Sequence, residues 1–288
     1  MHADLDLLYI TVYCTADDLL PERRRNARRR LTDAEVVTLC VSQVLMGIPS
    51  DRRFLKAARN QLGHLFPYLP SQHALHKRRV RLGETLEWLT AVFAGQSPGA
   101  ADELLLLDST PVECGRSLET APRSQLAEVC GYGYSSSHSR WFWGMRLHLL
   151  CPPDGTPRAA ALSALTGRSV RSRCRCSRMP SAAARRSSAT RATPGKSLPT
   201  RSNSSAERSC GRRAATNPSV SRCWPRSDSG SSRSSAPAKD LLSLERHGAR
   251  TLPNLLARVG VRLLALAACI SLNHKLGRPS RAIVDYTA

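Results

Sequence analysis

Apolar residues recur at helical spacing through the first hundred residues of the chain. In the stretch LTDAEVVTLCVSQVLMG, Thr32 and Glu35 have the spacing of a capping box, and Gly47 is a typical helix stop. Between them the apolar side chains fall on one face of a helix, at positions 36, 37, 40, 41, 44 and 45. Weaker versions of the same pattern cover residues 4–20, 51–62 and 84–94. The pattern predicts a small helical bundle over residues 1–100.

The pattern changes to strand-like runs between residues 101 and 166. ELLLLDST is an apolar run of strand length, and we expect this strand to end at Asp108. GMRLHLLC alternates and breaks at PPDG, and RAAALSAL follows at hairpin distance. Three successive strands after a helical region predict the opening of an α/β domain. An aspartate at the end of a strand is either a turn or cap residue or a metal ligand at the edge of the sheet.

The end of the chain, residues 240–288, returns to a helical pattern. GVRLLALAACISLNHKLG predicts one more helix, closed by Gly277 and Pro279. Nowhere does the sequence approach about 18 consecutive apolar residues, and its start lacks the basic and apolar regions of a signal peptide. We therefore expect a cytoplasmic protein with no membrane partner.

Residues 167–239 differ from everything around them. They hold 17 Lys and Arg against two acidic residues, so they supply +15 of the formal net charge of +21. Their aliphatic residues of the Val, Leu and Ile type are only three: Val170, Leu198 and Val220. Such a composition cannot offset the entropy of ordering the chain, so we expect this segment to be disordered. The basic excess also indicates a polyanionic partner, most simply nucleic acid.

The flanking regions resemble the bacterial insertion-sequence transposases of the DDE superfamily, which have an RNase H-like catalytic domain. The resemblance lies in LLLLDSTPVECGRS followed by YGYSSSHSRWFWGMRLHLLCPPDGTPRAAAL, in the opening ITVYCTADDLLPERRRNARRRLTDAEVVTLCVSQVLMGIPSDRRFL, and in the ending from KDLLSLERHGARTLPNLLARVG to RPSRAIVDYTA. Together these blocks cover residues 1–166 and 239–288.

This resemblance implies a metal site and a DNA substrate. In the family two Asp and one Glu hold two divalent ions, Mg²⁺ or Mn²⁺, which activate a water or a DNA 3′-hydroxyl for attack on phosphate. Asp108 matches the first Asp as catalytic residue and metal ligand. The other two acids should lie in residues 167–239, which match nothing in the family, so the RNase H-like domain would be incomplete. Whether the protein forms an oligomer on DNA stays open.

A shifted reading frame would explain the segment. Moved back by one base, the codons of residues 169–179 can encode Glu-Arg-Glu-Val-Ala-Leu-Pro-Met-Leu-Ala-Asp, which has the apolar spacing of a helix. The same shift turns residues 189–198 into Asp-Lys-Gly-Tyr-Ala-Gly-Lys-Glu-Phe and residues 230–234 into Ile-Glu-Ser-Ile. These resemble the family's second and third acidic motifs, so Asp would be replaced near Thr190 and Glu near Ser232. We interpret the segment as wrong-frame translation, from a mutation or from an error in the gene sequence.

Two basic clusters lie in the helical region. They are HKRRVR, which contains Lys77, Arg78 and Arg79, and PERRRNARRR, which ends in Arg28, Arg29 and Arg30. Each is either a solvated face or a set of phosphate contacts, and in a family that grips transposon ends they are our candidates for DNA binding.

Three functions therefore stay open. An active metal-dependent transposase requires three carboxylates at one site, of which the sequence supplies Asp108. A non-catalytic DNA-binding remnant requires only the N-terminal helices. An Arg/Ser-rich protein that binds RNA or DNA requires residues 167–239 to be the functional part. The resemblance favours a transposase copy that has lost catalysis.

Overall fold

The computed structural model describes residues 2–21, 30–115, 119–135, 139–165 and 242–287. Its elements in chain order are α1 (His2–Leu19), α2 (Asp33–Leu45), α3 (Asp51–Gln61), α4 (Gln72–Arg81), α5 (Gly83–Gly95), η1 (Pro98–Ala101), β1 (Leu106–Gly115), α6 (Thr120–Arg123), β2 (Gly131–Ser135), β3 (Arg140–Cys151), β4 (Ala159–Ala164), η5 (Leu244–Arg246), α7 (Leu252–Lys275) and η6 (Val284–Tyr286). Helices and an antiparallel sheet occur together, as the expected α/β class requires at its coarsest level.

The helix ends follow the local chemistry that the sequence predicts. Thr32 accepts a hydrogen bond from the Glu35 backbone N–H, and the Glu35 carboxylate accepts one from the Thr32 backbone N–H, so the capping box of α2 is formed. Gly47, just past α2, and Gly277, just past α7, both have positive φ, which glycine adopts without strain. The helices expected over 4–20, 51–62, 84–94 and 260–277 are confirmed as α1, α3, α5 and α7.

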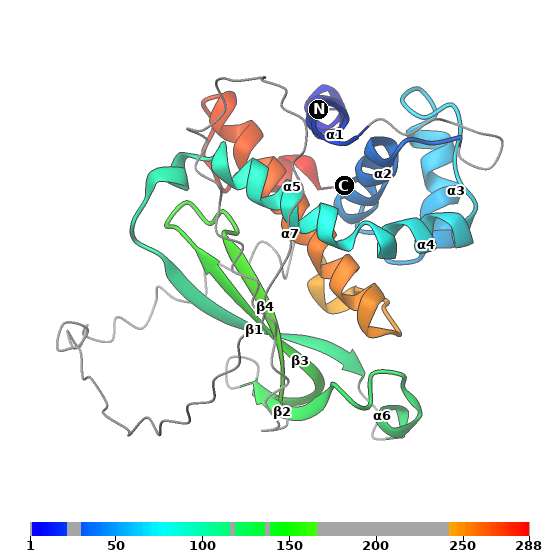
Figure 1. Ribbon diagram of the computed structural model, residues 1–288, viewed down its shortest axis with the longest axis vertical. Coiled ribbons are helices and arrows are strands. Elements are labelled where there is room, and N and C mark those ends of the chain that lie inside the picture. The colour runs from blue at the N-terminus through cyan, green and yellow to red at the C-terminus, as the bar shows by residue number, and fades with distance from the viewer. Residues whose placement is uncertain (1, 22–29, 116–118, 136–138, 166–241, 288) are drawn as a thin grey trace, which may run out of the picture. The chain divides into compact units, whose positions relative to one another are not determined.

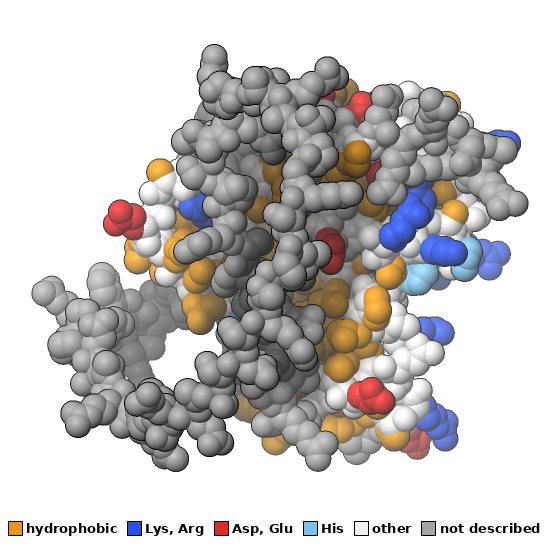
Figure 2. Space-filling model, in the orientation of Figure 1, with side chains coloured by type: hydrophobic (Ala, Val, Ile, Leu, Met, Phe, Trp, Pro, Cys, Tyr) orange, Lys and Arg blue, Asp and Glu red, His pale blue; other side chains and the backbone are white. Residues whose placement is uncertain are grey.

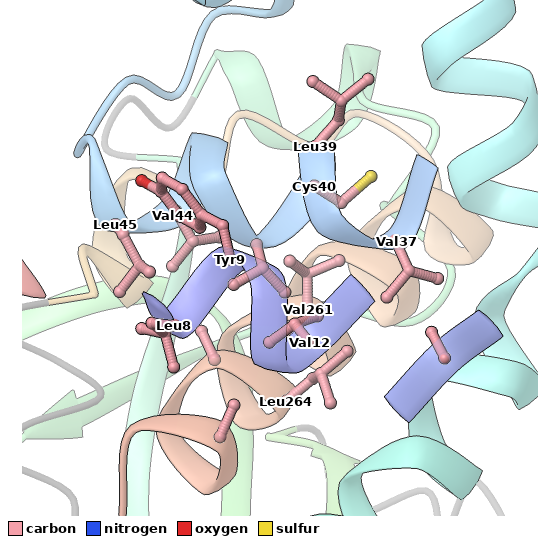
Figure 3. Packing of buried hydrophobic residues seen from close by; sticks show 14 of the residues in the cluster. Leu8, Tyr9, Val12, Val37, Leu39, Cys40, Val44, Leu45, Val261 and Leu264 are labelled. Carbon is pink, nitrogen blue, oxygen red and sulfur yellow. The ribbon is translucent and has the colours of Figure 1, made fainter. Parts of the chain in front are cut away.

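The core of the helical region joins both ends of the chain. Leu8, Tyr9 and Val12 of α1 lie among side chains of α2 and α7 (Figure 3). Leu264 of α7 is fully buried in the same cluster. The first five helices therefore do not close their core among themselves, because α7 completes it from the far end of the sequence (Figure 1).

The sheet is built around β3. β1 pairs antiparallel with β3 along its length, with Asp108 opposite Leu149. The other edge of β3 pairs antiparallel with β2 through residues 140–144 and with β4 through residues 145–150. One face packs on α7 in a second cluster, whose members include Val112, Leu149 and Val259. β2 lies outside the three strands that the sequence pattern predicts.

The first strand lies further along the chain than expected. The apolar run was expected to form a strand that ends at Asp108, but β1 begins at Leu106 and continues to Gly115. Leu104 and Leu107 are 63% and 69% exposed, whereas Thr110 and Val112 are buried. The buried positions of β1 therefore lie in the alternating stretch after Asp108. Asp108 is thus near the start of the strand and not at its end.

Helix α7 has the length and apolar composition of a membrane span but the burial of a core helix. It is long and apolar enough to cross a membrane, yet 94% of its most apolar window is buried inside the protein. It lines both hydrophobic clusters. That burial is typical of the core helix of a soluble protein.

Several predictions fall outside the described residues. These are the disorder of 167–239, the proposed replacements near Thr190 and Ser232, and the candidate contacts Arg28 and Arg29.

Candidate functional site

Asp108 lies on the inner side of the sheet. It is the third residue of β1 and shares its strand face with Thr110 and Val112, which are buried. The Asp108 side chain is half-buried, and its Oδ1 accepts a hydrogen bond from the Ser109 backbone N–H at 2.8 Å. The carboxylate is therefore held by its own strand, at the end of the sheet where β1 begins.

A second carboxylate lies near this end of the sheet but is committed to holding a turn. Asp154 Oδ2 accepts hydrogen bonds from the Gly99 backbone N–H and from Thr156 Oγ1, and its Oδ1 accepts one from the Thr156 backbone N–H, all at 2.8 Å. Burial, together with the charges of Asp154 and Asp108, raises the pKa of the Cys151 thiol to about 12. Both acids thus influence Cys151, but their hydrogen bonds give them separate structural partners.

These residues do not fit a two-metal centre. Two ions about 4 Å apart require several carboxylates around one point. Within the described ranges, no group of three His, Cys, Asp or Glu side chains is placed to hold a metal ion. The positions proposed for the missing acids, Thr190 and Ser232, lie outside those ranges, so Asp108 is the one expected ligand among the described residues.

The opposite face of the sheet carries a polar connection that the sequence pattern did not indicate. His148 of β3 is hydrogen-bonded through Nδ1 to Ser109 Oγ at 2.6 Å and through Nε2 to Ser163 Oγ at 2.8 Å. The three residues belong to β1, β3 and β4 and lie directly opposite or diagonal in the register. Pairing of the strands was needed to find this link, because 39 residues separate Ser109 from His148.

The basic cluster on α4 divides into outward and inward side chains. Lys77 is exposed. Arg78 donates to the Leu31 carbonyl and to Asp33 Oδ1, at 2.9 and 2.5 Å. Arg79 is 2% exposed, so it has no surface to offer to a phosphate. Among these three candidates, Lys77 is exposed, Arg78 is paired with Asp33, and Arg79 is an internal residue, so the expectation of a phosphate contact is kept for Lys77 and withdrawn for Arg79.

The buried Arg79 organises the helices around it. Its Nη2 donates to Asp51 Oδ1 at 2.9 Å and to Gln43 Oε1 at 3.1 Å, and Arg258 Nη2 donates to the same Asp51 oxygen at 2.8 Å. Burial alone would raise the pKa of Asp51, but the charges of Arg79 and Arg258 and the hydrogen bonds outweigh it and hold this pKa below its ordinary value. Asp51, at the start of α3, thus ties α3 to α4 and α7.

The second basic cluster is described only at its end. Arg30 is exposed, and its guanidinium carbon lies 5.2 Å from the centre of the Tyr68 ring, a cation–π arrangement. Arg30 therefore stays a candidate phosphate contact.

Helix α3 adds basic residues that the sequence analysis did not single out. Its exposed basic side chains are Arg52, Arg53, Lys56 and Arg59. Three of them follow the spacing i, i+4, i+7, a helical pattern that was visible in the sequence. Figure 2 shows Lys, Arg and His side chains gathered over α3 and α4 on the face in view. With Lys77 and Arg81 of α4, they define what we call the α3–α4 basic surface; Arg81 lies 3.9 Å from Asp33 Oδ1, but its side chain is exposed.

The comparisons give this site no family. No protein-family model, no curated protein and no solved structure matches the chain.

Proposed function

We propose that the chain is a copy of a DDE transposase of an insertion sequence that has lost catalysis and keeps the ability to bind DNA through its helices. It would act in the cytoplasm, without a membrane partner. The observation that supports DNA binding is the α3–α4 basic surface, which gathers six exposed Lys and Arg side chains: Arg52, Arg53, Lys56, Arg59, Lys77 and Arg81. Exposed cations on adjacent helices supply phosphate contacts, which give affinity without reading sequence.

The loss of catalysis follows from the acids available to Asp108. In the proposed family the RNase H-like domain needs three carboxylates for Mg²⁺ or Mn²⁺, and a lone carboxylate leaves a divalent ion mostly hydrated. Asp154, the other acid close to Cys151, is engaged with Gly99 and Thr156. The other two acids would be encoded only in the alternative reading frame of residues 167–239.

The experiment compares the full chain with a variant in which residues 167–239 are replaced by a Gly/Ser linker. Fluorescence anisotropy with a labelled DNA duplex is measured over a range of salt concentrations. We expect the linker variant to bind DNA with a smaller salt dependence, since the α3–α4 basic surface is intact. Circular dichroism confirms that the helices persist.

The outcome also tests the Arg/Ser-rich alternative, which the charge of +15 in residues 167–239 keeps open. That alternative expects a folded linker variant to lose all nucleic-acid binding. Complete loss of DNA binding with the helices intact would overturn the proposed function.

A further inference from the structure

Three arginines converge inside the helical region. Arg79 of α4 and Arg258 and Arg262 of α7 are 2%, 7% and 4% exposed. All three line one hollow, which is also bordered by Gln43 and by Ser243. The hollow is partly open to solvent, and its interior has room for about one water-sized particle. Its lining includes neither Asp108 nor a residue of the α3–α4 basic surface.

Among the described residues, the charges around this hollow do not balance. Asp51 accepts hydrogen bonds from Arg79 and Arg258, and within the described ranges it is the one carboxylate that either of them pairs with. Arg262 donates to main-chain oxygens instead, those of Leu242, Arg258 and Ser243, at 2.9 to 3.2 Å. In the part of the chain that the structure describes, two of the three buried guanidinium groups thus pair with one carboxylate and the third pairs with none, and buried charge without a counter-charge is costly.

One donor of the cluster also lacks an acceptor. Arg258 donates from Nη1 to the Pro49 carbonyl and from Nη2 to Asp51, but its Nε is buried and has no hydrogen-bond partner in the described part of the chain. A buried N–H on a charged group needs an acceptor. Burial and then the charges of Arg258 and Arg79 lower the pKa of Arg262 to about 9, so the cluster would gain from nearby negative charge.

We propose that the hollow between Arg79, Arg258 and Arg262 binds one small inorganic anion of about the size of chloride, which links α4 to α7. A single negative charge there would accept from the Arg258 Nε–H and would offset part of the positive excess. The size of the hollow favours a monatomic ion over a phosphate group with its four oxygens. The inference rests on these residues and is independent of the proposed function.

The experiment follows thermal unfolding of the full chain while chloride replaces gluconate at constant ionic strength. Because a ligand that binds only the folded state stabilises it by mass action, we expect the melting temperature to rise by roughly 3 °C for each tenfold increase in chloride above the dissociation constant. Arg262→Met removes one charge without touching Asp51 and should lose this response. Arg262→Lys keeps the charge and should retain it, as should Arg278→Gln at a surface arginine.

A direct measurement covers the case in which Arg262→Met does not fold. The full chain should broaden the chlorine NMR line only modestly more than Arg262→Lys does. Addition of bromide, which competes with chloride for the site, should reverse the broadening. Identical melting curves in chloride and gluconate, or a chloride response that persists in folded Arg262→Met, would overturn the proposal. Equal stabilisation by phosphate would overturn its assignment to a monatomic ion.

Discussion

The helices and the sheet bury their leucines to different extents. In the helical cluster Leu8, Leu39 and Leu264 are fully buried, whereas Leu104 and Leu107, at the start of the sheet, are 63% and 69% exposed. The two regions therefore differ in how completely their leucine side chains are covered. The helical core closes because α7 returns from beyond residue 241, while β1 pairs only with β3 among the described strands.

The first described residues after the basic segment belong to the buried cores. The first described residue after the basic segment, Leu242, is fully buried in the helical cluster, and Leu244 is buried against the sheet. Buried core residues are therefore found within a few residues of Lys239, where the charge excess ends. In the proposed family, the restored frame between these points would supply the chain that covers the exposed leucines of β1 and completes the metal site.

The largest effect is expected from repairing the reading frame. The gene should carry a single-base deletion or an equivalent shift near the codons of residues 166–168 and a compensating shift near those of 236–239. The repaired chain should carry Asp near position 190 and Glu near 232, bind Mg²⁺ or Mn²⁺, and nick the ends of its element. Nucleotide sequencing followed by a nicking assay checks this.

Two controls belong to that experiment. Asp108→Asn in the repaired chain should abolish nicking, while the chain as given should show no cleavage with or without this substitution. If the alternative frame holds no acidic residue at those two places, the frameshift interpretation fails and the Arg/Ser-rich arm becomes the leading hypothesis.

Removing the charge that joins the helices should be the next largest effect. Asp51→Asn leaves the buried Arg79 and Arg258 without the carboxylate that they share and should cost about 3–5 kcal/mol of unfolding free energy. Asp154→Asn, in the sheet region, weakens hydrogen bonds that a carboxylate accepts from neutral donors and should cost about 1–2 kcal/mol. Urea unfolding at neutral pH measures both. A smaller cost for Asp51→Asn than for Asp154→Asn would contradict the view that the helices depend on this ion pair.

The contribution of the Asp51 carboxylate to the free energy of unfolding should depend on pH. The pKa of Asp51 is lowered in the folded protein, so its stabilisation is complete above the unfolded value of about 3.9 and is lost as the pH falls through the lower folded value. The stability difference between the wild type and Asp51→Asn should therefore shrink below about pH 4. Urea midpoints measured down to acidic pH would show it, and a difference that grows on acidification would contradict this sign.

Leucine truncation compares the two regions directly. Leu264→Ala removes a fully buried side chain and leaves a cavity in the helical core, which should cost about 3 kcal/mol. Leu107→Ala removes an exposed side chain from β1 and should stay within about 0.5 kcal/mol. Equal costs, measured by urea unfolding, would mean that β1 is covered in solution and that the sheet is as complete as the helical core.

Local patterns were enough to predict most helices but not the sheet. The capping box of Thr32 and the glycine stops depend on neighbours in sequence, so α2 and α7 appear in the printed chain. Helix α4 has little apolar periodicity, since Leu75 is its one fully buried aliphatic residue, and it was noted only as a basic cluster. β2, with the sequence GYGYS, alternates Tyr with Gly but has no aliphatic residue, and β1 was misplaced because its most apolar stretch is exposed.

The candidate site shows the same limit. Sequence alone could not separate Lys77 from Arg79, because the partner of Arg79 is Asp51, 28 residues earlier in the chain. Nor could it show that Arg258 shares that partner across more than two hundred residues. The basic spacing on α3, by contrast, was available from the sequence, because exposed residues of one helix repeat locally.

The smallest effect concerns single surface charges and assigns DNA binding to one of the two regions. Lys77→Gln combined with Arg81→Gln removes two exposed cations from the α3–α4 basic surface. Arg123→Gln, on α6 beside the sheet, removes another exposed cation as a matched control. Each phosphate contact contributes nearly one counterion to the salt dependence, so the double variant should lower the slope of log affinity against log salt by about two.

The Arg123→Gln control should leave the slope unchanged, since we assign no phosphate contact to the sheet region. Anisotropy titrations with a DNA duplex measure both slopes, and an equal loss in the Arg123 variant would mean that binding follows net charge rather than the helical surface.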